Sequence, residues 1–387
     1  MKVMREIDGD MRKILRVGLE AALILAVGMG FGRFAFTAIY PHMVEEQMLS
    51  VQTGSFAASA NYIGYLTGAL LAIRFRMEHA HKVCIVALLG TTFCLGMQAL
   101  PLFDGGFIAL RGLAGVFSAL AIVGASQWLL GQKGLLQAAP LLYAGVGLGI
   151  ALSAELVVLG SAWQWGSRQL WLMLAVVSLC ISLVVIPALR ASDLPSHSRK
   201  APPTSTPIVL RTYPLIILYG LAGFGYIITA TYLPLLVKLV LPDWTAGHLW
   251  AVFGFGAVPS CFIWHAVQQR LRSKYALAFN LSLQAVGVAL PVLLPNAAGY
   301  LLSALLVGTA FMGTVTLVMP LAQRMAQNTS TNLIAVLTVA YSIGQIVGPL
   351  IANTFYRYTH SFDYSLLSAS FALLLATAFS FALALTE

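Results

Sequence analysis

Apolar runs of about 20 residues recur along this sequence, and their recurrence limits the fold more than any other feature. Each run is long enough to cross the hydrocarbon core of a bilayer as an α-helix. Apolar residues make up 59% of the chain and charged residues only 9%, whereas soluble domains carry about a quarter charged residues. We therefore predict an all-α polytopic membrane protein.

Turn and charge signals divide these runs into twelve predicted transmembrane helices. Breaks such as "PHMVEEQMLS", "RFRMEHAHK" and "QQRLRSK" separate neighbouring runs. The predicted spans are 15–42, 50–73, 82–101, 106–131, 138–160, 169–190, 211–238, 246–268, 275–295, 297–323, 331–356 and 364–385. A polar, proline-rich stretch, "RASDLPSHSRKAPPTSTP", interrupts the pattern in mid-chain. We therefore predict an N-terminal six-helix bundle at 1–190, a linker at 191–210 and a C-terminal six-helix bundle at 211–387.

The basic residues indicate how the chain is oriented in the membrane. If the N-terminus is placed inside, only Arg168, Lys238 and Arg357 of the 22 lysines and arginines fall in outside segments, while Arg33 and Arg111 lie within spans. Basic residues gather in the cytoplasmic loops of membrane proteins, so we predict that both termini and the linker are cytoplasmic. The net charge of +9 is then a topology signal and does not indicate a nucleic-acid partner.

The second half of the sequence repeats features of the first. "GFGRFAFTAIYP" in the first span aligns without gaps on "GFGYIITATYLP" in the seventh. At nearly the same spacing, Gly115 aligns with Gly308, and "GVGLG" in the fifth span aligns with "GQIVG" in the eleventh. Agreement among these matches indicates an internal duplication. We predict that 15–190 superposes on 211–385 about an axis along the membrane normal, with spans one and seven facing each other, an arrangement typical of transporters.

The fourth span carries "RGLAGVFSA", an arginine followed four residues later by a glycine and then small residues. With two six-span halves and a basic linker, the chain resembles the major facilitator superfamily, whose fourth-span motif Arg111, Gly115, Ser118 and Ala119 fit. "GMGFGRFAFTAIYP" in the first span resembles the bacterial YbfB/YjiJ-like branch. The resemblance implies twelve transmembrane helices in two pseudosymmetric six-helix bundles, alternating access, and a multi-pass protein of the bacterial inner membrane.

Two segments depart from patterns common in that superfamily. The loop between the second and third spans, within "GALLAIRFRMEHAHK", keeps Gly68 and its basic residues but lacks the usual aspartate. In the fifth span Gly149 is followed by Ile150, whereas the antiporter motif has a Gly-Pro pair. A Gly-Pro pair occurs instead in the eleventh span, at 348–349. The second departure argues against a typical drug/proton antiporter.

Three ionisable residues lie deep within predicted spans, namely Arg33, Arg111 and Glu155. Helix rise places all three in the outer half of the membrane at similar heights, and the resemblance implies that spans one, four and five border a central cavity. An intramembrane charge is a functional-site hypothesis by default. We therefore predict that both arginines point into the cavity and that Glu155 approaches at least one of them.

Each member of this cluster has an expected role. Arg33 suits an anionic group such as a carboxylate because its planar guanidinium can donate two parallel hydrogen bonds, and Tyr40 shares its helix face. Arg111, with Ser118 below it, has the same option. Glu155 is the candidate for proton exchange, so that substrate and proton would compete for the arginines and Arg111 would share in the coupling. The alternative is a static ion pair that orders the N-terminal half.

The predicted spans of the C-terminal half hold no deep charge, so polar aromatic and amide residues are the candidates there. Tyr226 occupies the position equivalent to Arg33, and Tyr341 and Gln345 share a face of the eleventh span. We predict that all three line the cavity and shape the substrate site. Hydrogen bonds that only hold helices together are the alternative for each.

These features predict a monomeric secondary active transporter for a small organic solute, with an anion favoured by the arginines, the bilayer as its surroundings and protons as the coupling ion. No cofactor or metal is expected, because the four cysteines lie in apolar runs without metal-ligand spacing. One alternative is a proton-antiport exporter of drugs or metabolites, in which a cationic substrate pairs with Glu155. The seven scattered histidines disfavour a membrane enzyme, and a receptor or scaffold would be expected to carry a sizeable soluble domain.

Overall fold

The computed structural model describes residues 2–191, 209–240, 246–326 and 332–383, and within these ranges it consists of helices joined by short connections. The elements of the first half are α1 (Lys2–Leu25), η1 (Ala26–Phe34), α2 (Ala35–Glu45), α3 (Val51–Ile73), η2 (Met77–His79), α4 (Ala80–Gln98), α5 (Asp104–Ser126), η3 (Gln127–Gln132), η4 (Leu136–Ala138), α6 (Ala139–Ala162) and α7 (Ser167–Arg190). Those of the second half are α8 (Val209–Val240), α9 (Ala246–Arg270), α10 (Ser273–Leu293), α11 (Ala297–Ala326), α12 (Leu333–Thr359) and α13 (Asp363–Phe381).

Twelve helices in the described residues are long and apolar enough to cross a membrane, which confirms the predicted all-α fold with twelve spans. The agreement has a physical cause, because a bilayer core requires about 20 apolar residues from each helix. Only the ends differ. The helical run of the first span extends from Lys2 to Glu45 and so exceeds the predicted 15–42 at both ends, and α8 (Val209–Val240) contains the predicted 211–238.

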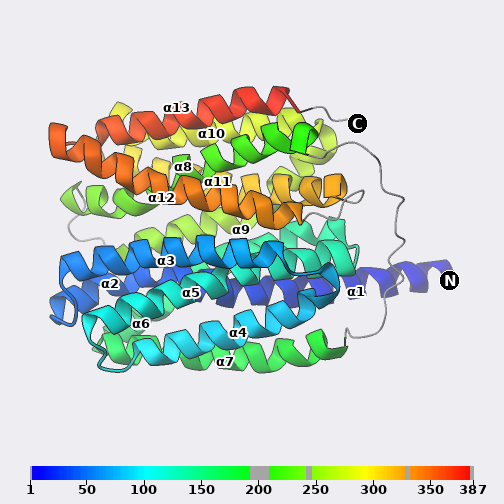
Figure 1. The fold of residues 1–387 in the computed structure, drawn as a ribbon, viewed down its shortest axis with the longest axis horizontal. Helices are drawn as coiled ribbons and strands as arrows, with labels where there is room; N and C mark the ends of the chain where they lie inside the picture. Colours follow the sequence, from blue (N-terminus) through cyan, green and yellow to red (C-terminus); the bar gives the residue numbers. More distant parts are fainter. Residues whose placement is uncertain (1, 192–208, 241–245, 327–331, 384–387) are drawn as a thin grey trace.

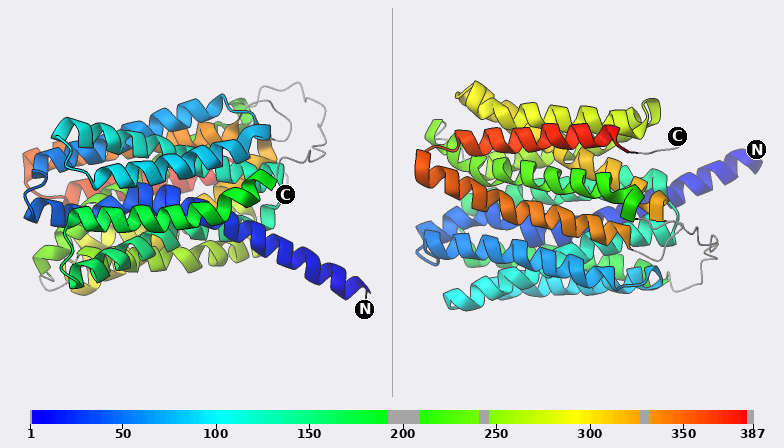
Figure 2. Two further views of the ribbon diagram at one scale, coloured as in Figure 1. Left: turned by 90° about the horizontal axis from the view of Figure 1, so that it is seen from below. Right: turned by 45° about the horizontal axis from the view of Figure 1, so that its top comes forward.

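The helices form two groups that lie one above the other in Figure 1, with α1–α7 below and α8 and α10–α13 above. Helix α9 lies where the two groups meet. The start of α1, the end of α7, the start of α8 and the end of α13 share one end of the bundle in all three views (Figures 1 and 2). An even number of crossings in each group accounts for this arrangement. The predicted linker at 191–210 falls almost entirely on 192–208, outside the described residues, so the domain boundaries stay a prediction.

Glycines hold the first and fifth spans together, and they do the same for the seventh and eleventh. A Cβ built on Gly145 of α6 would lie 2.6 Å from the Cα of Ala22 in the first span. A Cβ built on Gly344 of α12 would lie 2.7 Å from the main-chain nitrogen of Phe224 in α8. Membrane helices approach this closely only through small residues. The glycines of "GVGLG" and "GQIVG" therefore make equivalent contacts in the two halves.

The aligned glycines Gly115 and Gly308 show the same correspondence. Gly115 in α5 packs on the backbone of α3, where an added Cβ would lie 2.9 Å from the nitrogen of Tyr65. Gly308 in α11 packs on the backbone of α9, where it would lie 2.7 Å from the carbonyl oxygen of Phe253. Spans two and four thus pair as spans eight and ten do, as a duplicated chain requires.

The two groups of helices meet through α6 against α9 and through α3 against α12. At the end of the bundle that carries the start of α1, Nδ2 of Asn332 donates to the carbonyl oxygen of Ala72, 2.9 Å away. At the opposite end, the carboxylate of Glu155 in α6 faces the imidazole of His248 in α9, with 3.6 Å between Oε1 and Nδ1, which is an ion pair when the imidazole is protonated. The candidate site lies between these two contacts along the bundle.

Candidate functional site

The first span is π-helical over η1, the segment that carries the glycines and Arg33, and each residue of η1 is buried. Side chains of α5 donate to its carbonyl oxygens. Ser118 Oγ lies 2.6 Å from the oxygen of Gly28. Arg111 Nη1 lies 3.1 Å from the oxygen of Gly32, and its Nη2 lies 3.2 Å from that of Arg33. Irregular backbone at membrane depth is tolerated where neighbouring groups satisfy it in this way, and π-helical turns are frequent at functional sites.

Arg33 extends from this segment into a cage of aromatic rings. Its guanidinium carbon lies 4.1 Å from the ring centre of Tyr65, 5.2 Å from that of Tyr62 and 5.5 Å from that of Phe34. Its Nη2 donates to Oε1 of Gln345, 2.7 Å away. The residue is only 4% exposed, and Nε and Nη1 have no hydrogen-bond partner within the part of the chain that the structure describes. Ring faces stabilise a cation, but they leave these two donors unsatisfied.

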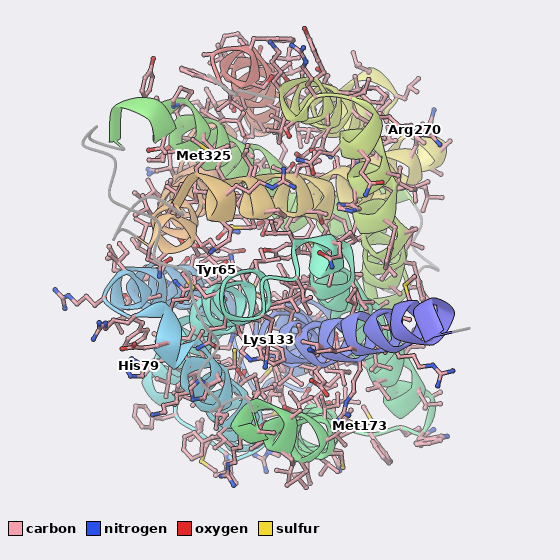
Figure 3. All side chains as sticks on the ribbon, turned by 90° about the vertical axis from the view of Figure 1, so that its right-hand side faces the viewer. Tyr65, His79, Lys133, Met173, Arg270 and Met325 are labelled. Atoms are coloured by element: carbon pink, nitrogen blue, oxygen red, sulfur yellow. The ribbon has the colours of Figure 1, made fainter. Side chains whose placement is uncertain are left out.

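Gln345 continues the hydrogen bonding into the other half of the protein. Its Nε2 donates to Oη of Tyr226, 2.7 Å away. The ring of Tyr226 stacks on that of Tyr341, with 5.6 Å between the centres. Arg33 and Tyr226, which align in the two repeats, are therefore bridged by one amide. Four of the predicted site residues come together here, and Figure 3 shows Tyr65 of the cage between the two groups of helices.

Arg111 and Ser118 bond to the backbone of the first span in this structure, and their predicted role in substrate binding stays a prediction. The Arg111 guanidinium carbon lies 4.5 Å from the ring centre of Phe36, and the residue is 1% exposed. Both terminal nitrogens are taken by main-chain oxygens of the first span, and the Ser118 hydroxyl also bonds to Ala114. The backbone oxygens of the π-helical segment need donors, and α5 is the adjacent helix. In this structure the two residues support Arg33 from behind.

Tyr40 also lies outside the cluster. Its ring packs against Gly54 of α3 and stacks on Phe36, with 5.2 Å between the ring centres. Two helical turns separate it from Arg33, and at that distance the side chain meets the second span.

The prediction that Glu155 approaches an arginine is wrong. Its carboxylate pairs with His248, and the two side chains are 44% and 50% exposed. Among the described residues, neither Arg33 nor Arg111 has a carboxylate partner. The reason is the rotation of α6 about its axis, because Gly254 of α9 packs on the α6 backbone one turn before Glu155. That face of α6 therefore looks toward α9.

The aromatic cage and its neighbours were missed by the sequence interpretation. Tyr62 and Tyr65 are three residues apart, so they share a face of α3, and that spacing is the signal that could have found them. Trp250 of α9 donates its indole nitrogen to the carbonyl oxygen of Phe34, 3.2 Å away. This bond ties the backbone beside Arg33 to the C-terminal half.

The described residues contain no group of three histidine, cysteine or acidic side chains that could hold a metal ion. The arrangement instead offers a buried cation, an amide and two phenols. Such groups bind and orient an anion through hydrogen bonds.

A family model described as uncharacterised MFS-type transporter YbfB matches residues 25–381. This chain belongs to that family. The match includes Arg33 in the first span and Gln345 in the eleventh, and it confirms the resemblance drawn from the first and fourth spans. A comparison with curated proteins gives no match. Membership and the twelve apolar helices make the protein a multi-pass membrane transporter of the major facilitator superfamily.

Proposed function

We propose that this family member is a secondary active transporter that moves a small organic anion by alternating access. One observation carries the proposal. Arg33 is a buried guanidinium at the junction of the two halves, it has no carboxylate partner among the described residues, and two of its nitrogens lack hydrogen-bond partners. Burying an unpaired charge is costly, and an anion would supply the missing partner.

The position of Arg33 also suits transport. The one hydrogen-bond partner that its side chain has among the described residues, Gln345, belongs to the opposite half. An anion that takes the place of the Gln345 oxygen would be held by the N-terminal half through Arg33, and by the C-terminal half through the amide nitrogen of Gln345 and the hydroxyl of Tyr226. A ligand that contacts both halves can bias their relative position, which is what alternating access requires.

We also propose that protons are the coupling ion, that the protein acts as a monomer in the bacterial inner membrane, and that both termini are cytoplasmic. Glu155 remains the candidate for proton exchange, although not by competition for the arginines. Its partner His248 lies in the opposite half. Protonation of Glu155 would weaken a contact between the halves, so the proton would act on their separation.

A thermal-shift screen of the purified protein in detergent tests the anion proposal. The panel contains organic acids, amino acids, sugars and lipophilic cations. An acid at 100 times its Kd should stabilise the folded protein by about 2.7 kcal/mol. Arg33→Lys keeps the charge but loses the planar fork, so we expect it to fold and to lose most of this shift. Arg168→Lys, at an exposed arginine, is the matched control. Stabilisation by cations with no response to acids would contradict the proposal and favour the exporter alternative.

A further inference from the structure

An aromatic wall lies beside Arg33, and we define it as Phe34, Tyr226, Trp250, Phe253 and Phe311. Phe311 is its centre. The Phe311 ring centre lies 4.5 Å from that of Tyr226, 5.7 Å from that of Phe253 and 6.2 Å from that of Phe34. Trp250 stacks on Phe253 at 4.9 Å with an interplanar angle of 9°. Three helices of the C-terminal half therefore present their rings to one member from the first span.

The aromatic wall lies next to the guanidinium of Arg33. Phe34 connects the two, since its ring centre lies 5.5 Å from the Arg33 guanidinium carbon and 6.2 Å from the ring centre of Phe311. A second route runs from Arg33 through Gln345 to the hydroxyl of Tyr226. An anionic group bound at Arg33 therefore has the wall within reach of the rest of the same small molecule.

The wall offers ring faces and few polar groups. The Trp250 indole nitrogen already donates to Phe34, and the Tyr226 hydroxyl accepts from Gln345. Arg111 offers less to a second anion than Arg33 does, because its two terminal nitrogens bond to main-chain oxygens and, among the described residues, only its Nε lacks a partner. A second carboxylate, or the hydroxyls of a sugar, would lose water here without gaining partners, which is unfavourable.

We infer that the transported anion is an aromatic monocarboxylate, whose carboxylate binds Arg33 and whose ring packs against the aromatic wall. The inference rests on the proposed function, since it assumes that Arg33 receives the anion. A planar ring can stack on Phe311 or Tyr226 or meet them edge-to-face, and such contacts add stabilisation beyond the burial of apolar area. An aliphatic acid of similar size would obtain only the burial.

Binding must separate the two halves before it can occur. Arg33 is 4% exposed, and Trp250 and Phe311 are each 3% exposed. The bond from Trp250 to the Phe34 oxygen crosses the junction of the halves. A ligand that enters between the halves would break some of the existing ring contacts. An aromatic molecule can form new ring contacts in their place, whereas an aliphatic one compensates for them less well.

Four small probes test the inference on the full-length protein, with binding followed by isothermal titration. Benzoate is the aromatic monocarboxylate, cyclohexanecarboxylate the aliphatic match, terephthalate the dicarboxylate and benzamide the uncharged ring. We expect benzoate to bind roughly threefold to tenfold more tightly than cyclohexanecarboxylate, and terephthalate and benzamide to bind more weakly than both. Equal affinities for the two monocarboxylates would overturn the inference while leaving the proposed function intact. Tightest binding of benzamide would overturn both.

Substitutions test whether the aromatic wall causes the preference for benzoate over cyclohexanecarboxylate. Phe311→Leu should bring the affinities for benzoate and cyclohexanecarboxylate close together, whereas Arg33→Lys should weaken both acids and keep their ratio. Phe371→Leu, at a phenylalanine that is 61% exposed, is the matched control and should change neither value. If Phe311→Leu does not fold, Phe253→Leu replaces it, and the ranking of the four probes by the unaltered protein still decides the inference. A Phe311→Leu protein that retains the full benzoate preference would contradict it.

Discussion

Arg111 donates a hydrogen bond from Nη2 to the main-chain carbonyl oxygen of Arg33, 3.2 Å away. One buried arginine thus fixes the backbone from which the other extends. The second bond from Arg111, to the oxygen of Gly32, acts on the preceding peptide. Because the two bonds hold consecutive carbonyls of a π-helical segment, we propose that Arg111 positions Arg33 without contacting the substrate.

Arg111→Lys tests this relationship. A lysine keeps the positive charge but cannot donate to both carbonyls in the geometry of the planar fork. We expect the free energy of unfolding to fall by about 1.5–3 kcal/mol, the usual range for a hydrogen bond to a charged group, and acid binding to weaken at the same time. Thermal unfolding and titration of the same sample measure both. A variant with unchanged stability and abolished binding would instead place Arg111 in contact with the substrate.

Gly30→Ala tests whether the first span depends on close approach to α6. A Cβ at Gly30 would lie 3.0 Å from the main-chain nitrogen of Ile150 and even closer to Gly149. Overpacking of this kind costs about 1–3 kcal/mol, so the thermal midpoint should fall. Gly96→Ala is the control, because its nearest neighbour would be 3.9 Å away, and it should unfold at the same temperature as the unaltered protein or at a higher one, since alanine is the better helix former. Equal midpoints for both variants would contradict the packing described here.

Asn332→Asp tests the contact between α12 and α3. The Asn332 side chain accepts from the nitrogen of Ala335 and donates to the oxygen of Ala72 across the junction. Aspartate retains the helix cap and loses the donor. We expect the end of α3 and the start of α12 to separate more often. Double electron–electron resonance between spin labels on the two helices would then show an additional population at longer distances. An unchanged distance distribution would show that this bond does not hold the halves together.

Glu155→Gln tests the coupling role. Glutamine cannot release a proton, so we expect proteoliposomes with this variant to lose accumulation driven by a proton gradient and to keep exchange of substrate across the membrane. Glu20→Gln, at a glutamate that pairs with Arg16 within one helix, is the control and should accumulate normally. A Glu155→Gln protein that still concentrates substrate against its gradient would remove Glu155 from the coupling.

The sequence allowed the spans to be predicted because bilayer thickness fixes helix length, whatever the neighbours are. The depths of Arg33, Arg111 and Glu155 in the membrane, estimated from helix rise, stay predictions. Rotation of a helix about its axis does not follow from helix rise. The contact of α6 with α9 turns Glu155 toward His248, and the carbonyl oxygens of η1 attract Arg111. Packing between helices decides both, and a single sequence does not specify that packing.

The cluster of Arg33, Gln345, Tyr226 and Tyr341 could be predicted from the sequence, because the internal repeat relates the residues of the N-terminal half to those of the C-terminal half. The alignment of Arg33 with Tyr226 placed them at equivalent positions, and both bond to Gln345. The aromatic wall was not within reach. Aromatic side chains are common in apolar spans, and nothing in their local spacing shows that those of α8, α9 and α11 meet at one point.

Gln345→Glu tests the central claim most directly, because it places a carboxylate where the account expects the substrate's carboxylate. The new ion pair with Arg33 should be stronger than the amide contact, so the thermal midpoint without ligand should rise, and acids that stabilise the unaltered protein should no longer shift it. Gln345→Leu is the control, because it removes the amide without adding a carboxylate. This variant should unfold at a lower temperature than the unaltered protein and should still be stabilised by acids. If acids stabilise the Gln345→Glu protein as much as the unaltered one, Arg33 is not the site at which the anion binds.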